Sequence, residues 1–340
     1  MHSPVLGFAL VFIAAIAGGA LAVPLKHRRI FELENIYIPS TLVMMLILPF
    51  IMAAFVMPNW PEAVHAAGPR TVWTGAAYGF GWGVGSILFG YGVTLAGMSV
   101  GFAVIMGINT AVGSILPFLV KSPGDILTRG GLVILLGIAG CVAGVAVCGR
   151  AGALRERSLD IDARRRHGFG RALLVCVASG LLSACANLGF AFTSRVGEEA
   201  QKLGANPVFS TLASWMPVFW GATVALLFWF GGLQIKRGTW RKNVGTDAPH
   251  DWLMGVLMGV IWFIGTIPYG MGAYYLGRLG TSVGWAVNIA SSLIVANIFG
   301  FVGGEWAGAP PRALQKLYAG LSILIAAIIV LAIGSSMTGY

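Results

Sequence analysis

Apolar runs of about 20 residues alternate with short polar loops along the whole sequence, and this alternation restricts the chain to a membrane fold. The 340 residues are 57% hydrophobic and only 10% charged. The runs predict an all-α integral membrane protein with ten transmembrane helices, over residues 5–25, 37–57, 72–96, 98–119, 131–149, 170–193, 208–231, 252–276, 281–303 and 314–338. The first run is too long for the apolar core of a signal peptide, so it counts as a span.

Basic residues are concentrated in alternate loops. Sixteen of the 22 lysines and arginines lie in the loops that follow the first, fifth, seventh and ninth spans. Because cytoplasmic loops carry an excess of Lys and Arg, these loops are predicted to face the cytoplasm and both termini the periplasm, in a bacterial inner membrane. The net charge of +10 then reflects topology and contact with membrane lipid, and it does not indicate nucleic-acid binding.

The sequence repeats itself on the two sides of a long basic loop. WGVGSILFGYG from Trp82 aligns with WFIGTIPYGMG from Trp262 at an offset of 180, and GMSVGFAV from Gly97 aligns with GTSVGWAV from Gly280. We divide the chain into a first five-helix repeat at 1–150, a basic cytoplasmic linker at 151–169 and a second repeat at 170–340. An odd number of spans inverts the second repeat, which is the plan of many transporters; duplication kept only for packing is the alternative.

Six glycines crowd the stretch YGFGWGVGSILFGYG, from Tyr78 to Gly92. A dinucleotide-binding turn would need a preceding strand and a carboxylate about 20 residues further on, and neither is present. Gly75, Gly79 and Gly83 recur every four residues. This spacing favours close contact between helices over a phosphate-binding loop.

One face of the third span, and its counterpart in the eighth, carries an aromatic ring, a hydroxyl and a second ring at helical spacing. These residues are Trp82, Ser86 and Phe89, and Trp262, Thr266 and Tyr269. Rings can cover the apolar C–H face of a sugar while polar groups meet its hydroxyls, so the faces are candidate sugar-binding surfaces. Core packing is the alternative.

The fourth and ninth spans add further candidates for this site. They are Asn109, Asn288, Ser292 and, in the repeated GTSVGWAV segment, Trp285. Polar side chains in hydrocarbon need hydrogen-bond partners, which neighbouring helices can supply as well as a ligand. We expect a substrate site between the third, fourth, eighth and ninth spans, near the midplane of the membrane.

Several longer motifs carry a resemblance to a known family. WGVGSILFGYGVTLAGMSVGFAVIMGINTAVGSILP, GRAGALRERS after the fifth span, LGANP before the seventh and GGEW at the end of the ninth resemble the L-rhamnose/proton symporter family of the drug/metabolite transporter superfamily. The resemblance implies a ten-helix inner-membrane carrier that imports a deoxyhexose with a proton. Ala273, Gly265, Ser282 and Asn288 stand where well-known members carry histidine, glutamine or aspartate, so the chain is similar to a divergent member.

Together these features predict a secondary active transporter that imports L-rhamnose or a related deoxyhexose with a proton, by alternating access. A drug/metabolite-type exporter or exchanger of another small polar solute is the alternative. An integral membrane enzyme is disfavoured because the 12 acidic residues form no DxxD-type cluster. The four cysteines match neither a zinc site nor a redox pair, so no metal or other cofactor is expected.

Proton coupling needs a group whose pKa changes as the carrier changes state, and carriers usually place a carboxylate or histidine inside a span. This chain has no such residue in mid-span. The candidates are carboxylates at span ends that become buried when a gate closes: Glu34 first, then Glu199 and Glu305. An exposed or Arg-paired carboxylate at the membrane surface is the alternative reading of each.

Overall fold

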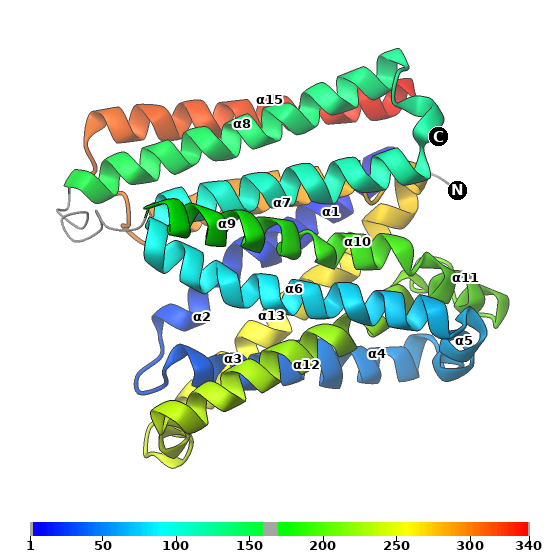
Figure 1. Cartoon of the computed structure of the whole chain (residues 1–340). Helices are drawn as coiled ribbons and strands as arrows, with labels where there is room; N and C mark the ends of the chain where they lie inside the picture. Colours follow the sequence, from blue (N-terminus) through cyan, green and yellow to red (C-terminus); the bar gives the residue numbers. More distant parts are fainter. Residues whose placement is uncertain (1–2, 159–168, 339–340) are drawn as a thin grey trace.

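The computed structural model describes residues 3–158 and 169–338, which form a bundle of helices with no β-strand among the described residues (Figure 1). The helices are α1 (Pro4–Ala20), α2 (Val23–Lys26), α3 (Leu33–Leu42), α4 (Leu48–Val56), α5 (Trp60–Ala67), α6 (Pro69–Ala96), α7 (Met98–Lys121), α8 (Arg129–Ser158), α9 (Phe169–Ser183), α10 (Cys185–Phe192), α11 (Ser194–Lys202), α12 (Thr211–Arg237), α13 (Ala248–Tyr275), α14 (Val283–Val302) and α15 (Pro311–Met337). A π-helical turn covers Val43–Ile47, and 3-10 turns cover Pro123–Asp125, Thr239–Val244 and Gly277–Leu279.

Ten segments of the described chain are long and apolar enough to cross a membrane, which confirms the predicted number of spans. They are Pro4–Lys26, Leu33–Val56, Pro69–Ala96, Met98–Lys121, Arg129–Ser158, Gly170–Lys202, Thr211–Arg237, Ala248–Tyr275, Val283–Val302 and Pro311–Met337. The predicted fifth span, 131–149, ends too early, because α8 continues past the apolar run to Ser158. The predicted sixth span, 170–193, ends with α10, and the separate helix α11 extends the segment to Lys202. Of the predicted linker, residues 159–168 lie outside the described residues.

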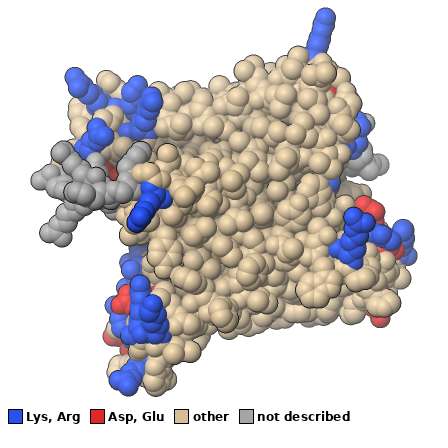
Figure 2. Space-filling model, viewed as in Figure 1, with Lys and Arg blue, Asp and Glu red and all other residues tan. Residues whose placement is uncertain are grey.

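Charged side chains gather at two opposite ends of the bundle, and a broad band without them separates the ends on the face shown in Figure 2. We call the end that holds α2 and the connection between α12 and α13 the basic end. The other is the terminal end, because α1 begins there and α15 finishes there (Figure 1). An uncharged band between charged ends is what a bilayer-spanning protein requires.

Three of the spans are discontinuous. The second span contains the π-helical turn, where the N–H of Leu48 bonds the carbonyl of Val43 five residues earlier. Pro49 lies directly after this turn. Proline lacks a backbone N–H, and in a regular α-helix its ring would clash with the carbonyl four residues earlier. The wider π-helical turn contains one more residue than an α-helical turn and so relieves this clash. The first span breaks between α1 and α2, and the sixth between α9, α10 and α11. Broken helices commonly border the substrate sites of transporters.

Helix neighbours in the two halves of the chain correspond. In the first half α1 packs against α13 and α14, and in the second half α9 packs against α6 and α7. Likewise α6 packs against α12, and α13 packs against α3. The fifth and tenth spans, α8 and α15, pack on each other (Figure 1). The contacts of α1 and α13 in one half thus correspond to those of α9 and α6 in the other.

The glycine face of α6 is a helix contact, as its spacing indicated. A Cβ atom at Gly79 would overlap the carbonyl oxygen of Val218 in α12, and a Cβ at Gly221 would overlap that of Ala76 in α6. Gly75 meets Pro217 in the same interface. Only glycine lets the two backbones approach so closely.

Candidate functional site

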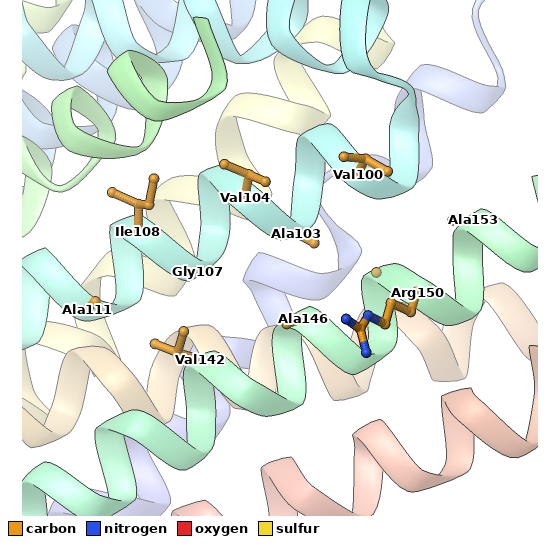
Figure 3. A pocket seen from close by; sticks show the side chains of 11 residues that line it. Val100, Ala103, Val104, Gly107, Ile108, Ala111, Val142, Ala146, Arg150 and Ala153 are labelled. Carbon is orange, nitrogen blue, oxygen red and sulfur yellow. The ribbon is translucent and has the colours of Figure 1, made fainter. Parts of the chain in front are cut away.

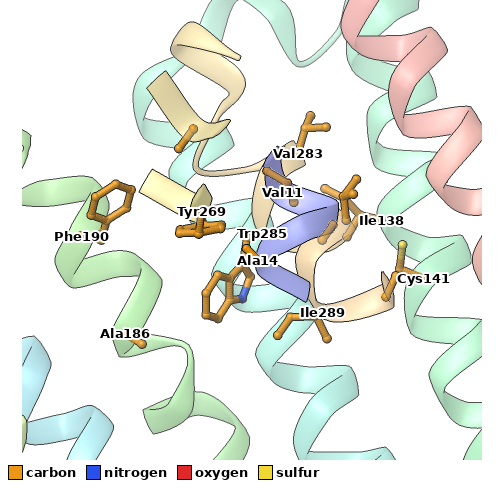
Figure 4. Close-up of a cluster of buried hydrophobic side chains, with 14 of the residues drawn as sticks. Val11, Ala14, Ile138, Cys141, Ala186, Phe190, Tyr269, Val283, Trp285 and Ile289 are labelled. Carbon is orange, nitrogen blue, oxygen red and sulfur yellow. The ribbon is translucent and has the colours of Figure 1, made fainter. Parts of the chain in front are cut away.

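Seven aromatic rings form a continuous cluster inside the bundle, from four separate spans and α10. They are Trp82, Phe190, Trp215, Phe219, Trp262, Tyr269 and Trp285, and we call them the aromatic cluster. Figure 4 shows Tyr269 between Phe190 and Trp285. The ring centroids of Phe190 and Trp215 lie 4.7 Å apart, and those of Tyr269 and Trp285 lie 5.6 Å apart. Stacked and edge-on pairs at such distances are stabilising beyond the area they bury.

The tryptophans that the sequence repeat aligns meet each other at the centre of this cluster. The rings of Trp82 on α6 and Trp262 on α13 are stacked, with centroids 5.3 Å apart and planes 25° from parallel. The edge of Trp262 also contacts Phe219 of α12. Both tryptophans are half-buried.

Asn187 of α10 bonds groups of α7, of α13 and of the turn before α14. Its amide nitrogen donates to the carbonyls of Gly113 (2.8 Å) and Thr281 (2.6 Å), and its Oδ1 accepts the hydroxyl of Tyr269 at 2.6 Å. All three groups are buried. Sequence reasoning missed Asn187, although a lone asparagine in an apolar span was a usable signal, because such a group must find partners.

Several polar atoms around the cluster have no hydrogen-bond partner among the described residues. They include the side-chain oxygens of Asn109 and Asn288 and the indole nitrogen of Trp215. Trp285 donates from its indole nitrogen to the backbone carbonyl of Asn109, at 3.4 Å, which leaves the Asn109 side chain unused. Unpaired buried polar atoms are costly, and hydroxyl groups of a ligand could satisfy them.

Other predicted site residues are engaged elsewhere. Ser86 donates to the carbonyl of Trp82 one turn back, and Thr266 donates to that of Phe263. Phe89 contacts Phe102 of α7, outside the aromatic cluster. Ser292 faces α1, where its hydroxyl occupies the place of a Cβ at Gly18. The structure therefore brings together the aromatic residues of the two stripes, except Phe89, and leaves the hydroxyls of Ser86 and Thr266 bonded within their own helices.

A polar pocket of ≈ 200 Å³ adjoins the cluster on the side of the terminal end. Phe190 belongs to the aromatic cluster and also lines the pocket. Glu198 lines the pocket too and is exposed, so the pocket reaches the surface of the protein. Lys121, Ser214 and Thr281 also line it. Its volume is below the roughly 300–1,000 Å³ of pockets for drug-sized ligands, which suits a small solute.

A polar network lies at the basic end. The fully buried carboxylate of Asp251, in the first turn of α13, accepts the backbone N–H groups of Arg29 (2.9 Å), Ile30 (2.7 Å) and Phe31 (2.8 Å). It thereby ties the connection between the first two spans to the eighth. Sequence reasoning did not single out Asp251, because the residues next to it in the sequence give no sign that its carboxylate binds a loop more than 200 residues away.

Side chains of α3 and α12 continue this network. Asn35 donates to Asn243 at 2.7 Å, and Gln234 donates to the carbonyl of Glu34 at 3.1 Å. At the surface Lys242 pairs with Glu32 at 2.6 Å, and its hydrogen bond and charge lower the pKa of Glu32. Hydrogen bonds and an ion pair thus link elements from both halves of the chain at the basic end.

The three predicted coupling carboxylates have different environments. Glu34, at the start of α3, is 1% exposed; its Oε1 accepts the hydroxyl of Thr239 at 3.1 Å, and its Oε2 lies 3.5 Å from the guanidinium of Arg237. Glu199 lies on α11, where it pairs with Lys202 at 2.8 Å. Glu305 follows α14 and pairs with Lys26. Of the three, Glu34 is the one sequestered from solvent.

Comparison with known proteins gives the family. The family described as L-rhamnose-proton symport protein (RhaT) matches residues 2–338. Relatives include the L-rhamnose-proton symporters of Escherichia coli O1:K1 / APEC and Shigella dysenteriae serotype 1 (strain Sd197), each 26% identical over 329 residues, which cover 95% of this chain and 95% of the relative. The match extends over nearly the whole chain at low identity, as for a divergent member, and the family is one of transporters, not enzymes. The chain belongs to the L-rhamnose-proton symport protein family.

Proposed function

We propose that the protein imports L-rhamnose or a related deoxyhexose together with a proton, as a secondary active transporter. The observation that carries the proposal is the aromatic cluster with its unpaired polar atoms, in a chain that belongs to a symporter family. Aromatic faces and unpaired polar groups are complementary to the two faces of a sugar ring. The family match gives no support to the alternative, an exporter of another small polar solute.

Alternating access would use two inverted five-helix repeats, at 1–150 and 170–340, with a basic linker at 151–169. The correspondence of helix neighbours supports this: α1 with α13 and α14 mirrors α9 with α6 and α7. The stacking of Trp82 on Trp262, aligned in sequence, agrees with a pseudo-twofold axis through this pair. Rocking one repeat against the other would expose the cluster to each end in turn.

In our proposal the basic end faces the cytoplasm of a bacterial inner membrane and both termini face the periplasm. The excess of Lys and Arg in the loops at the basic end supports this orientation. The pocket beside the cluster lies toward the terminal end, while the Asp251 network closes the basic end. The described conformation would then admit sugar from the periplasm, the direction that import requires.

The residues that would hold the sugar come from both repeats. Trp82 and Trp262 would part and cover its apolar face, with Tyr269 and Trp285 beside them. The side chains of Asn109 and Asn288 would bond its hydroxyls, because both have an unpaired oxygen. Ser86, Phe89, Thr266 and Ser292 would need a change of rotamer or of helix position to take part.

Glu34 would carry the coupled proton. It is buried against Arg237 while the basic end is closed, and opening of that end would separate the pair and expose the carboxylate to the cytoplasm. The charge that faces Glu34 and its contact with water would therefore both change with the state of the gate. Glu199 and Glu305 are the weaker candidates because each pairs with a lysine and both side chains are more exposed than that of Glu34.

Ligand-dependent melting of the purified protein tests the substrate class. We expect L-rhamnose and related deoxyhexoses to raise the melting temperature with increasing concentration, because a ligand that binds only the folded state stabilises it. Amino acids and organic cations serve as controls for the exporter alternative. A shift with one of these controls, and none with any sugar, would contradict the proposed substrate.

A further inference from the structure

An apolar groove of ≈ 480 Å³ runs along the outside of the bundle between α7 and α8 (Figure 3). Its lining residues all come from these two helices, so no third described helix covers it. Valine, alanine, glycine and isoleucine make up the lining, with Arg150 as the one charged residue. The groove is separate from the aromatic cluster and from the pocket beside it.

Small residues explain why the groove exists. A Cβ atom at Gly149 would overlap the Cβ of Ala103, so α7 and α8 touch at this crossing. Away from it the helices part: a Cβ at Gly107 would have Val142 Cγ1 as its nearest neighbour, at 3.8 Å. Because Gly107, Ala111 and Ala146 have little or no side chain, the space between the diverging helices stays open.

The groove has the length of one leaflet of a bilayer. It extends on α7 from Val100, near the basic end, to Ala111, and at a rise of about 1.5 Å per residue this stretch is about 16 Å long. Half of a hydrocarbon core of about 30 Å is about 15 Å. A chain lying in the groove would reach from the headgroup level of the basic end to the midplane.

Arg150 supplies the positive charge of this site. Its side chain lies along the groove toward Ala146 (Figure 3), and it has no ion pair among the described residues. The nearby carboxylate of Glu156 instead accepts the backbone N–H (3.1 Å) and hydroxyl (2.9 Å) of Ser99. An unpaired guanidinium beside hydrocarbon is costly, and a phosphate can pair with it through two hydrogen bonds.

We propose that the groove binds an anionic phospholipid of the basic-end leaflet, with one acyl chain between α7 and α8 and the headgroup phosphate on Arg150. A second copy of this chain is a poorer occupant, because it would have to bring a free carboxylate. The described acidic residues of the basic end already have partners: Glu32, Glu34, Glu156, Asp247, Asp251 and Glu305. A lipid brings the phosphate and the apolar chain in one molecule.

Native mass spectrometry of the full-length protein, with phosphatidylglycerol and phosphatidylcholine of identical acyl chains, tests this site. We expect one phosphatidylglycerol to bind at least about tenfold more tightly than phosphatidylcholine. Arg150→Gln should remove this preference, and Gly107→Leu should weaken both lipids by filling the groove. Arg171→Gln, another exposed arginine of the basic end, and Gly232→Leu, where a Cβ has no neighbour within 4 Å, are the matched controls.

Three results would overturn the proposal. Both lipids carry a phosphate but only phosphatidylglycerol has a net negative charge, so equal binding of the two to the wild type would contradict a preference for an anionic lipid. The same loss in Arg171→Gln as in Arg150→Gln would show only general attraction to a basic surface. A wild-type dimer that Gly107→Leu converts to a monomer would assign the groove to a second copy instead.

Discussion

Alanine in place of Trp82 or of Trp262 is expected to abolish the rise in melting temperature that L-rhamnose produces in the wild type. In the proposed site both rings cover the apolar face of the sugar, and loss of an aromatic anchor costs about 2 kcal/mol or more, roughly a 30-fold rise in Kd. Trp73→Ala is the control, since Trp73 lies on the same helix as Trp82 but is 75% exposed. The measurement is a sugar titration followed by thermal melting.

Because the two tryptophans also stack on each other, either alanine variant loses packing as well. Trp262→Phe separates the two effects: it keeps a ring at the position, so it should restore most of the sugar-dependent stabilisation. If both alanine variants bind L-rhamnose as the wild type does, the stacked pair is core packing and the sugar binds elsewhere.

The second large effect is expected at Glu34. Glu34→Gln should abolish accumulation of L-rhamnose driven by a pH gradient in proteoliposomes, while exchange of labelled for unlabelled sugar survives. Glutamine can keep the bond to Thr239 but can neither carry a proton nor pair with Arg237 as a charge. Glu199→Gln is the matched control, a carboxylate of the terminal end that already pairs with Lys202.

Accumulation at the wild-type level in Glu34→Gln would exclude Glu34 as the proton carrier. Loss of both accumulation and exchange would instead indicate a structural role in closing the basic end, where the backbone carbonyl of Glu34 is bound by Gln234. The exchange assay therefore distinguishes coupling from gating.

Hydropathy was sufficient to predict the ten spans, because hydrocarbon demands a long apolar run from every crossing helix. It failed where a helix outlasts the apolar run, as α8 does by continuing to Ser158. The backbone hydrogen bonds of the helix continue there into polar sequence, and hydropathy cannot predict this because it detects only the apolar part of a helix. The glycine spacing of α6 correctly predicted a close helix contact, because glycines on one face of a helix let the backbone of a neighbouring helix approach.

The candidate site was predictable only in part. Trp82, Trp262 and Tyr269 could be found because the internal repeat marks them, and the structure joins all three to the aromatic cluster. Phe190 and Asn187 escaped detection because their role comes from tertiary contacts. Asn187 bonds two backbone carbonyls, and any residue has a carbonyl, so no sequence pattern could identify these partners.

Uptake of labelled L-rhamnose by proteoliposomes that contain only this protein tests the central claim most directly. With an imposed pH gradient, acidic on the side from which the sugar enters, we predict accumulation above the external concentration that a protonophore abolishes. Uptake that merely equilibrates the sugar, at the same rate and to the same level with and without the gradient, would contradict proton-coupled import.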